Sequence, residues 1–172
     1  MTPAQLSLAI DDHELWLSSR GLEGKKLFLE NTRIRDAHFT GKDLSHASFA
    51  GTHFTNVSFI DCALSFLYAA HCQWRDVDIS GSKLTCISLR EGILTRCDFT
   101  GCDMYFATMT DALFKSCTFD KTLLKNANLT NSKLTNSPLD RAYLCDTILT
   151  GSTLRDAGTA SVHHLTRGII KR

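Results

Sequence analysis

The sequence predicts a solenoid, a fold in which one small structural unit is stacked many times along an axis. Every fifth residue from Leu29 to Leu154 is apolar, which gives 26 consecutive positions at one period without a slip. A helix repeats at about 3.6 residues and a strand at about 2, so a period of five fits neither element. With 43% of the chain apolar, chance cannot produce this run. An unbroken short period indicates stacked repeats, and it takes precedence over local propensity.

The repeat has a second regular position. Two residues before most of the large apolar centres stands a small or apolar residue such as Ala47, Cys97 or Ala127, and Lys42 is the clear exception. The other three positions hold mostly Asp, Asn, Thr, Ser, Lys, Arg and Gly. Each pentad therefore has two inward positions, one large and one small, which together fill a narrow interior without voids.

These pentads carry a resemblance to a known family. Residues 47–51, 97–101 and 127–131 read ASFAG, CDFTG and ANLTN, which match the A(D/N)LXX pattern. The chain from about residue 27 to 156 resembles the pentapeptide-repeat family on this basis. The resemblance implies an all-β solenoid, a right-handed quadrilateral parallel β-helix with four pentads in each square coil. At four pentads a coil, the 26 pentads of the region would make 26/4, or 6.5 coils.

A stack of coils needs caps at its ends, so three segments are expected. Residues 1–26 should form a helical N-terminal cap, 27–156 the β-helix, and 157–172 a C-terminal helical cap. At the first end Thr2 is the expected N-cap, Pro3 the first helical residue, and Gln5 the partner in a capping box. Trp16 and Leu17 are expected to cover the open end of the first coil.

The last segment offers two interpretations. Four apolar residues share one helical face there, namely Val162, Leu165, Ile169 and Ile170. They are expected to cover the last coil. Alternatively they form a homodimer contact, since members of the family that this chain resembles often pair through this end.

Composition is typical of a soluble protein, with 22% charged residues and a net charge of +1. No apolar run approaches the roughly 18 residues of a transmembrane helix, so membrane insertion is not expected. Residues 1–10 lack the basic and apolar regions of a secretory signal, which favours the cytoplasm. Five of the seven cysteines occupy the small inward position, where they are expected to act as reduced, inert apolar side chains.

The protein is not expected to be an enzyme. The sequence has no nucleophile elbow, zinc-binding HExxH, Walker loop or dinucleotide fingerprint, so neither a cofactor nor a metal is predicted. Under the four-sided fold His38, His46, His53 and His71 fall on four different sides and cannot converge. No pentad is interrupted by a loop, and a rod without loops is expected to lack a cleft.

The charges sort by side when the sequence is divided into turns of four pentads. The side that carries Ile34, Phe54 and Trp74 has three acidic residues against seven basic ones, a balance of +4. These candidate basic-side residues are Arg33, Arg35, Arg75, Arg96, Lys115, Lys133 and Arg155. The next side has five acidic residues against two basic ones, a balance of −3. The basic side lacks outward aromatic residues, so nucleic-acid binding is not favoured.

A candidate partner surface is formed by apolar residues at outward positions. Phe66, Cys86 and Phe106 recur at intervals of four pentads and should form a vertical ladder, with Tyr105 beside it and Tyr68 just past the corner. A clustered apolar patch on a soluble protein indicates a binding surface. Other outward apolar residues are expected to be scattered, namely Ile60, Ile93, Leu113, Leu123, Tyr143 and Ile148.

The sequence supports three hypotheses about function. The first is a non-enzymatic binding or adaptor module of bacterial type with an unidentified protein partner. The second, implied by the resemblance, is a mimic of duplex DNA that occupies DNA gyrase or another topoisomerase and gives quinolone tolerance. It needs a strongly negative surface, which a chain of net charge +1 does not offer. The third is a secreted effector or secretion-system accessory, because residues 13–24 resemble leaders that precede such repeats in some bacterial proteins.

Overall fold

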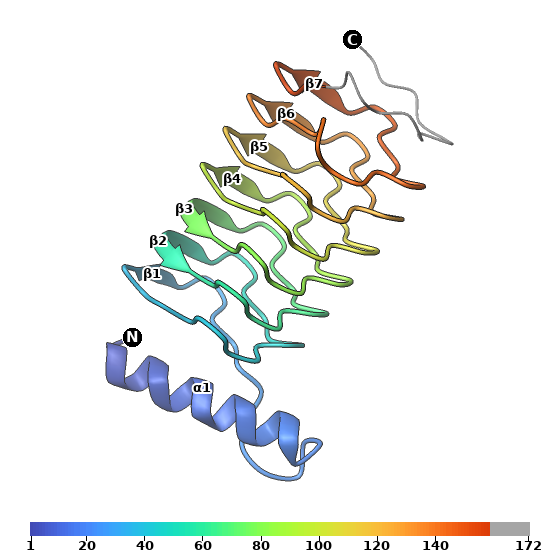
Figure 1. The fold of residues 1–172 in the computed structure, drawn as a ribbon. Helices are drawn as coiled ribbons and strands as arrows, with labels where there is room; N and C mark the ends of the chain where they lie inside the picture. The colour runs from blue at the N-terminus through green and yellow to red at the C-terminus, as the bar shows by residue number, and fades with distance from the viewer. Residues whose placement is uncertain (159–172) are drawn as a thin grey trace.

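The structure is a computed structural model that describes residues 1–158, and it consists of one helix followed by a stack of coils (Figure 1). Helix α1 spans Pro3–Ser18. The seven strands are β1 (Arg33–Arg35), β2 (His53–Ser58), β3 (Gln73–Asp78), β4 (Ile93–Thr95), β5 (Leu113–Lys115), β6 (Lys133–Thr135) and β7 (Thr153–Arg155).

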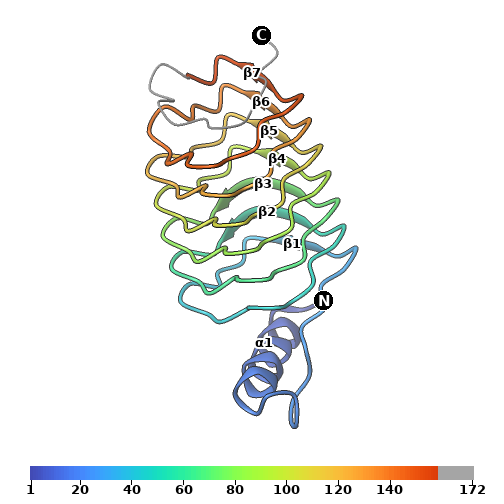
Figure 2. The same cartoon turned by 90° about the vertical axis from the view of Figure 1, so that its right-hand side faces the viewer.

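All seven strands form one parallel sheet in the order of the sequence, from β1 to β7. Each strand pairs with the strand that lies four pentads further along the chain, so Ile34 faces Phe54 and Phe54 faces Trp74. The sheet runs along one side of the stack and the chain returns around the other sides in each coil (Figure 2). The predicted parallel solenoid is therefore confirmed, with the register that the period of five requires.

The other sides of the coils are held by single bridges instead of continuous strands. Ser48 pairs with Tyr68 and Lys83 with Asp103, again four pentads apart. Between these bridges the chain turns, as where the N–H of Ala47 donates to the Leu44 carbonyl at 3.1 Å. One side is thus a regular pleated surface, whereas the others consist of short extended pieces and turns.

The interior is a column of large side chains that touch from coil to coil. Phe39 stacks on Phe59 with ring centroids 4.6 Å apart, and Phe99 stacks on Phe119 at 5.1 Å. One coil further on, the same position holds the buried Leu139. Each coil buries its apolar residues only against its neighbours, which makes the stack dependent on its ends.

Most polar residues at the small inward position bond to the backbone, and the buried Ser132 is an exception whose hydroxyl has no partner among residues 1–158. The hydroxyls of Thr52, Thr122 and Thr147 donate to the carbonyls of Leu29, Phe99 and Leu124 in the preceding coil, at 2.6, 2.8 and 2.7 Å. Burying a hydroxyl that makes such a bond costs little free energy, whereas burying an unpaired hydroxyl strongly destabilises the fold. Small hydroxyl residues can therefore replace alanine or cysteine inside the stack.

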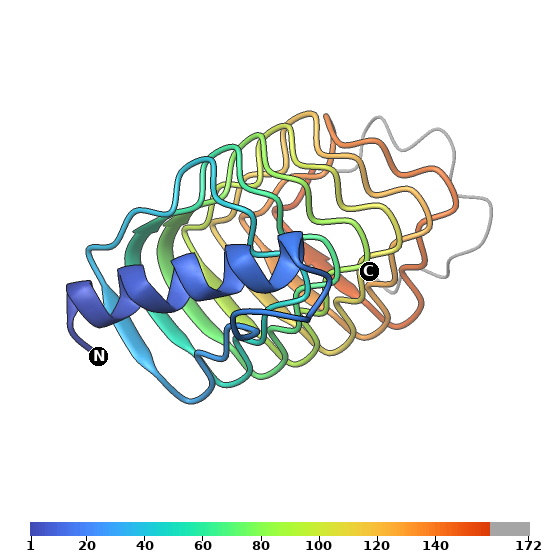
Figure 3. The same cartoon turned by 90° about the horizontal axis from the view of Figure 1, so that it is seen from below.

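Helix α1 crosses the open end of the first coil (Figure 3). Its start confirms the predicted capping box, in which the Gln5 N–H donates to the Thr2 hydroxyl and the Thr2 N–H to the Gln5 side chain. The helix continues without a break to Ser18. Within the helix Ile10 and His13 are buried. Trp16 and Leu17, which were expected to cover the coil, are only half-buried.

A buried histidine joins the helix to the coil. His13 Nδ1 accepts the N–H of Leu27 and its Nε2 lies 3.1 Å from the carbonyl of Ser45. Because Leu27 must donate, the ring is neutral and carries its proton on Nε2. The exceptional Lys42 also lies at this end, where its ammonium pairs with Glu14 at 3.1 Å.

At the opposite end the core reaches Ala157. Val162, Leu165, Ile169 and Ile170 lie outside the described residues. The C-terminal helical cap and the homodimer contact therefore stay predictions.

Candidate functional site

The structure arranges Phe66, Cys86 and Phe106 in one vertical column at a single corner of successive coils. The N–H of Phe66 donates to the Thr85 carbonyl at 2.9 Å, and the N–H of Cys86 to the Tyr105 carbonyl at 2.8 Å. The side chains of Phe66 and Phe106 are 53% and 56% exposed. The backbone bonds thus fix two exposed rings two coils apart, with the smaller Cys86 between them.

His46 extends this column by one coil. Its ring stacks on Phe66 with centroids 4.9 Å apart and an angle of 2° between the planes. We call His46, Phe66, Cys86 and Phe106 the aromatic ladder. His46 was not expected in this column, although its place four pentads before Phe66 was the available signal.

Two tyrosines flank the aromatic ladder. Tyr68 is 50% exposed and belongs to the next side of the coil, where it pairs with Ser48 and Ser88. Tyr105 is half-buried and directly precedes Phe106. The candidate surface therefore wraps around the corner instead of lying on one flat side.

The backbone of the aromatic ladder is strained. Phe66, Cys86 and Phe106 have φ angles of 59°, 59° and 58°, in the left-handed region that bulky residues avoid. Elsewhere in the described coils such corners are held mostly by Asn, Asp or Gly. Asparagine would suit the same turn better, so the backbone conformation does not explain the two phenylalanines. Strain of this kind often accompanies a functional role.

The predicted basic side coincides with the continuous sheet β1–β7. Six of its seven cations lie on strands, namely Arg33, Arg35, Arg75, Lys115, Lys133 and Arg155. Arg96 lies instead at the corner, where its guanidinium contacts both carboxylate oxygens of Asp76 at 2.6 and 2.7 Å. This bidentate pair holds the pKa of Asp76 below its usual range.

The expectation that the remaining outward apolar residues are scattered is wrong for four of the six. Ile93 of β4 pairs directly with Leu113 of β5, and Leu123 pairs with Tyr143 on another side. The members of each pair are four pentads apart in the sequence. The period that defines the core therefore also brings outward residues together.

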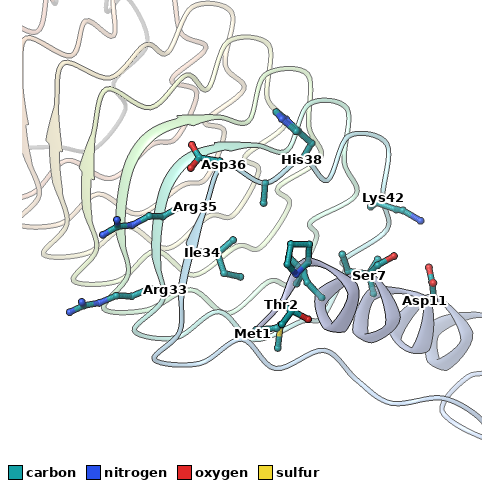
Figure 4. A pocket seen from close by; sticks show the side chains of 14 residues that line it. Met1, Thr2, Ser7, Asp11, Arg33, Ile34, Arg35, Asp36, His38 and Lys42 are labelled. Atoms are coloured by element: carbon teal, nitrogen blue, oxygen red, sulfur yellow. The ribbon is translucent and has the colours of Figure 1, made fainter.

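The expected lack of a cleft is also wrong. A pocket of about 490 Å³ lies where α1 meets the first coil (Figure 4). Ile34 lies at its wall, while Arg33 and Arg35 point away from the helix. The pocket arises because one straight helix cannot fill the whole end of a square coil. Its polar groups do not converge on one point, which a specific small-molecule site requires.

Within residues 1–158 no group of three or more His, Cys, Asp or Glu side chains could hold a metal ion. In the same part of the chain no helix is long and apolar enough to cross a membrane. The seven cysteines are free thiols, and five of them are buried at the predicted inward positions.

The model of the pentapeptide-repeat family matches the chain in eight copies, over residues 29–65, 72–115, 107–142 and 122–157. Among solved structures the chain is similar to trypsin-treated QnrB1, described as a plasmid-mediated fluoroquinolone resistance protein. That match has a TM-score of 0.53 and 18% identity, and it covers 86% of this chain and 85% of the other.

A second similar structure is HetL of the cyanobacterium Nostoc, described as a pentapeptide repeat protein involved in the regulation of heterocyst differentiation. It has a TM-score of 0.40 and 18% identity, and the match covers 84% of this chain and 79% of the other. No curated protein matches the chain. At these identities the likeness to solved structures concerns the fold.

Proposed function

The chain belongs to the pentapeptide-repeat family, and from this premise we propose that it is a non-enzymatic scaffold that binds a protein partner. The contact is the aromatic ladder with Tyr68 and Tyr105. The observation that supports it most is the presence of two exposed phenylalanines in a left-handed conformation, at corners where the fold favours asparagine.

The aromatic ladder has the properties of a binding hot spot. Burying one phenylalanine ring contributes about 1.5–3 kcal/mol, and binding energy is commonly concentrated in a few aromatic residues. Hydrogen bonds fix the coil backbone at both corners, so binding of a partner need order only the side chains there. The adjacent tyrosines add apolar area and hydroxyl groups for hydrogen bonds.

The setting we propose is the cytoplasm of a bacterium. Support comes from Cys62, Cys72, Cys97, Cys102 and Cys117, which act as small apolar side chains inside the coils. The residues that resemble a secretion leader have a structural task here, since His13 joins α1 to the first coil. The proposal therefore does not need an export role for this segment.

Mimicry of DNA is the competing function, because the similar protein QnrB1 is described as a fluoroquinolone resistance protein. The acidic side of this chain carries Asp61, Asp78, Asp98, Asp120 and Asp140, and Arg141 pairs with Asp120 at 2.8 Å. Duplex DNA presents one charge per roughly 1.7 Å, which is far denser than this side. The charge distribution thus favours a different protein partner.

The test compares two variants in affinity capture from a bacterial lysate. The double variant Phe66→Asn, Phe106→Asn should lose the captured partner and keep the fold, measured by circular dichroism. The matched control Lys121→Asn changes another exposed left-handed corner, at φ 55°, and should retain the partner. Equal capture by all three proteins would refute the proposed contact.

A supercoiling assay separates the competing function. The scaffold should neither inhibit DNA gyrase nor protect it from a quinolone. If it does either, and the acidic-side variant Asp98→Asn, Asp140→Asn weakens the effect, DNA mimicry replaces the proposed function.

A further inference from the structure

The outward face of the sheet β1–β7 has a regular composition that the proposed function does not use. Its two outward columns contain fourteen residues, of which six are cationic and none is acidic. The first column is Arg33, His53, Gln73, Ile93, Leu113, Lys133 and Thr153. The second is Arg35, Thr55, Arg75, Thr95, Lys115, Thr135 and Arg155. We call these fourteen residues the basic sheet face.

Cations and threonines alternate strictly along the second column. Neighbouring strands are about 4.8 Å apart, so a cation recurs about every 9.6 Å over a face about 29 Å long. Within residues 1–158, Arg155 is the one cation of this face with an acidic partner, Asp156 at 3.8 Å. The other five carry charge that is not neutralised by an ion pair among these residues.

An apolar pair lies in the middle of the basic sheet face. Ile93 and Leu113 face each other on neighbouring strands and are 45% and 39% exposed. Lys115 lies on the same strand as Leu113, and Lys133 is the next residue of the column. Beside Ile93, a shallow hollow of about 210 Å³ is lined by residues of both columns.

From this geometry we infer that the basic sheet face binds an acidic protein segment that carries an apolar side chain among its carboxylates. The apolar side chain packs on Ile93 and Leu113, and the carboxylates pair with Arg75, Lys115 and Lys133. The threonine hydroxyls donate further hydrogen bonds to carboxylate oxygens. Complementary charge selects such a segment and speeds its encounter with the face.

The composition of the face disfavours other occupants. A nucleic acid would bind the cations, but single strands are held on sheets by stacking on aromatic rings, and this face has an aliphatic pair instead. The chain's own residues 159–172 contain Arg167, Lys171 and Arg172 and no acidic residue. Two copies meeting through this face would oppose like charges.

The inference is independent of the proposed function because the two surfaces lie on different sides of the coil. The basic sheet face follows residues 33–35 and their equivalents, while the aromatic ladder follows residue 46 and its equivalents. A variant of one surface leaves the other unchanged. Failure of one proposal can therefore be distinguished from failure of the other.

The experiment selects ligands from a displayed library of random peptides with the purified full chain. We expect the enriched peptides to be acidic with a central Leu, Ile or Phe. The variant Ile93→Thr, Leu113→Thr and the variant Arg75→Gln, Lys115→Gln should each weaken the best peptide by about tenfold or more in fluorescence anisotropy. Threonine suits a strand, so the first variant should keep the fold.

The control variants lie on two other sides of the coil. Leu123→Thr removes an outward apolar residue, and Arg90→Gln removes an outward cation. Both control variants should bind the peptide as tightly as the wild type does. The inference is overturned if no acidic sequence is enriched or if the controls lose as much as the face variants. It is also overturned if a single-stranded RNA or duplex DNA oligonucleotide binds the face more tightly, or if the chain self-associates through it.

Discussion

At the scale of single residues, the corners of the coils reveal a conflict between stability and side-chain choice. Phe106 has a φ of 58° and, among residues 1–158, no stacked ring partner. A left-handed residue other than glycine or asparagine costs about 1–2 kcal/mol. We therefore expect Phe106→Asn to raise the free energy of unfolding by about 1 kcal/mol, measured by denaturant titration.

Phe66 provides the internal comparison. Its substitution by Asn relieves the same strain but removes the stack on His46, worth about 0.5–1.5 kcal/mol. The gain in stability should therefore be smaller than for Phe106. If both substitutions destabilise the fold by more than about 1 kcal/mol, the rings belong to the packing and not to a binding surface.

The cysteines should divide into two reactivity classes. Burial raises the pKa of Cys62 to about 11 and that of Cys102 to about 12, so these thiols are protonated near neutral pH. Cys86 is half-exposed and Cys145 exposed. Alkylation of the native protein followed by mass spectrometry should modify these two first, and modification of Cys62 or Cys102 without unfolding would contradict the packed interior.

At the scale of elements, His13 makes the docking of α1 sensitive to pH. Burial lowers its pKa below the ordinary 6.5, so the unfolded chain binds a proton more readily than the folded one. The contribution of the neutral ring to the free energy of unfolding is therefore fully present above about pH 6.5. It is lost as the pH falls through the lowered pKa of the folded state. Urea titrations at several pH values should show this loss in the wild type and a smaller loss in His13→Gln.

The groups around His13 support this direction. Asp43 and Glu14 favour the protonated ring and Lys26 opposes it, but desolvation is the largest effect. If His13→Gln keeps the full pH dependence, the other titrating groups of the chain are responsible. Docking of α1 would then not depend on the neutral ring.

The turn after α1 requires a glycine for two reasons. Gly24 has a φ of 70°. A β-carbon there would collide with the carbonyl of Asp12 and lie 2.7 Å from the backbone nitrogen of Trp16. Gly41 has a similar φ of 72° but nothing within 4 Å. Thermal unfolding should show that Gly41→Ala costs about 1 kcal/mol and Gly24→Ala clearly more. Equal costs would mean that the close approach of the turn to α1 is not rigid.

At the scale of the whole molecule, the fold could be predicted because every pentad has the same length. A fixed length converts sequence distance into position, so residues four pentads apart must lie in one column, as Ile34 and Phe54 do. The pairs His46–Phe66 and Ile93–Leu113 follow from the same arithmetic. These pairs are not evident from the core pattern, because outward residues look unrelated until they too are placed four pentads apart.

The N-terminal end could be predicted only in part. The capping box depends on neighbouring residues, and it formed as expected. Which residues of α1 are buried depends on the angle at which the helix crosses the coil, and no local pattern encodes that angle. For this reason His13 and the pocket beside Ile34 emerged only from the structure.

Contact between a protein partner and the aromatic ladder is tested most directly by site-specific photo-crosslinking in cells. A photoreactive phenylalanine analogue is introduced at Phe66, at Phe106 and, as a control, at Lys121. We predict that the first two positions crosslink to the same protein and that the control does not. Crosslinks of equal yield at all three positions, or none at Phe66 and Phe106, would show that no partner contacts the aromatic ladder specifically.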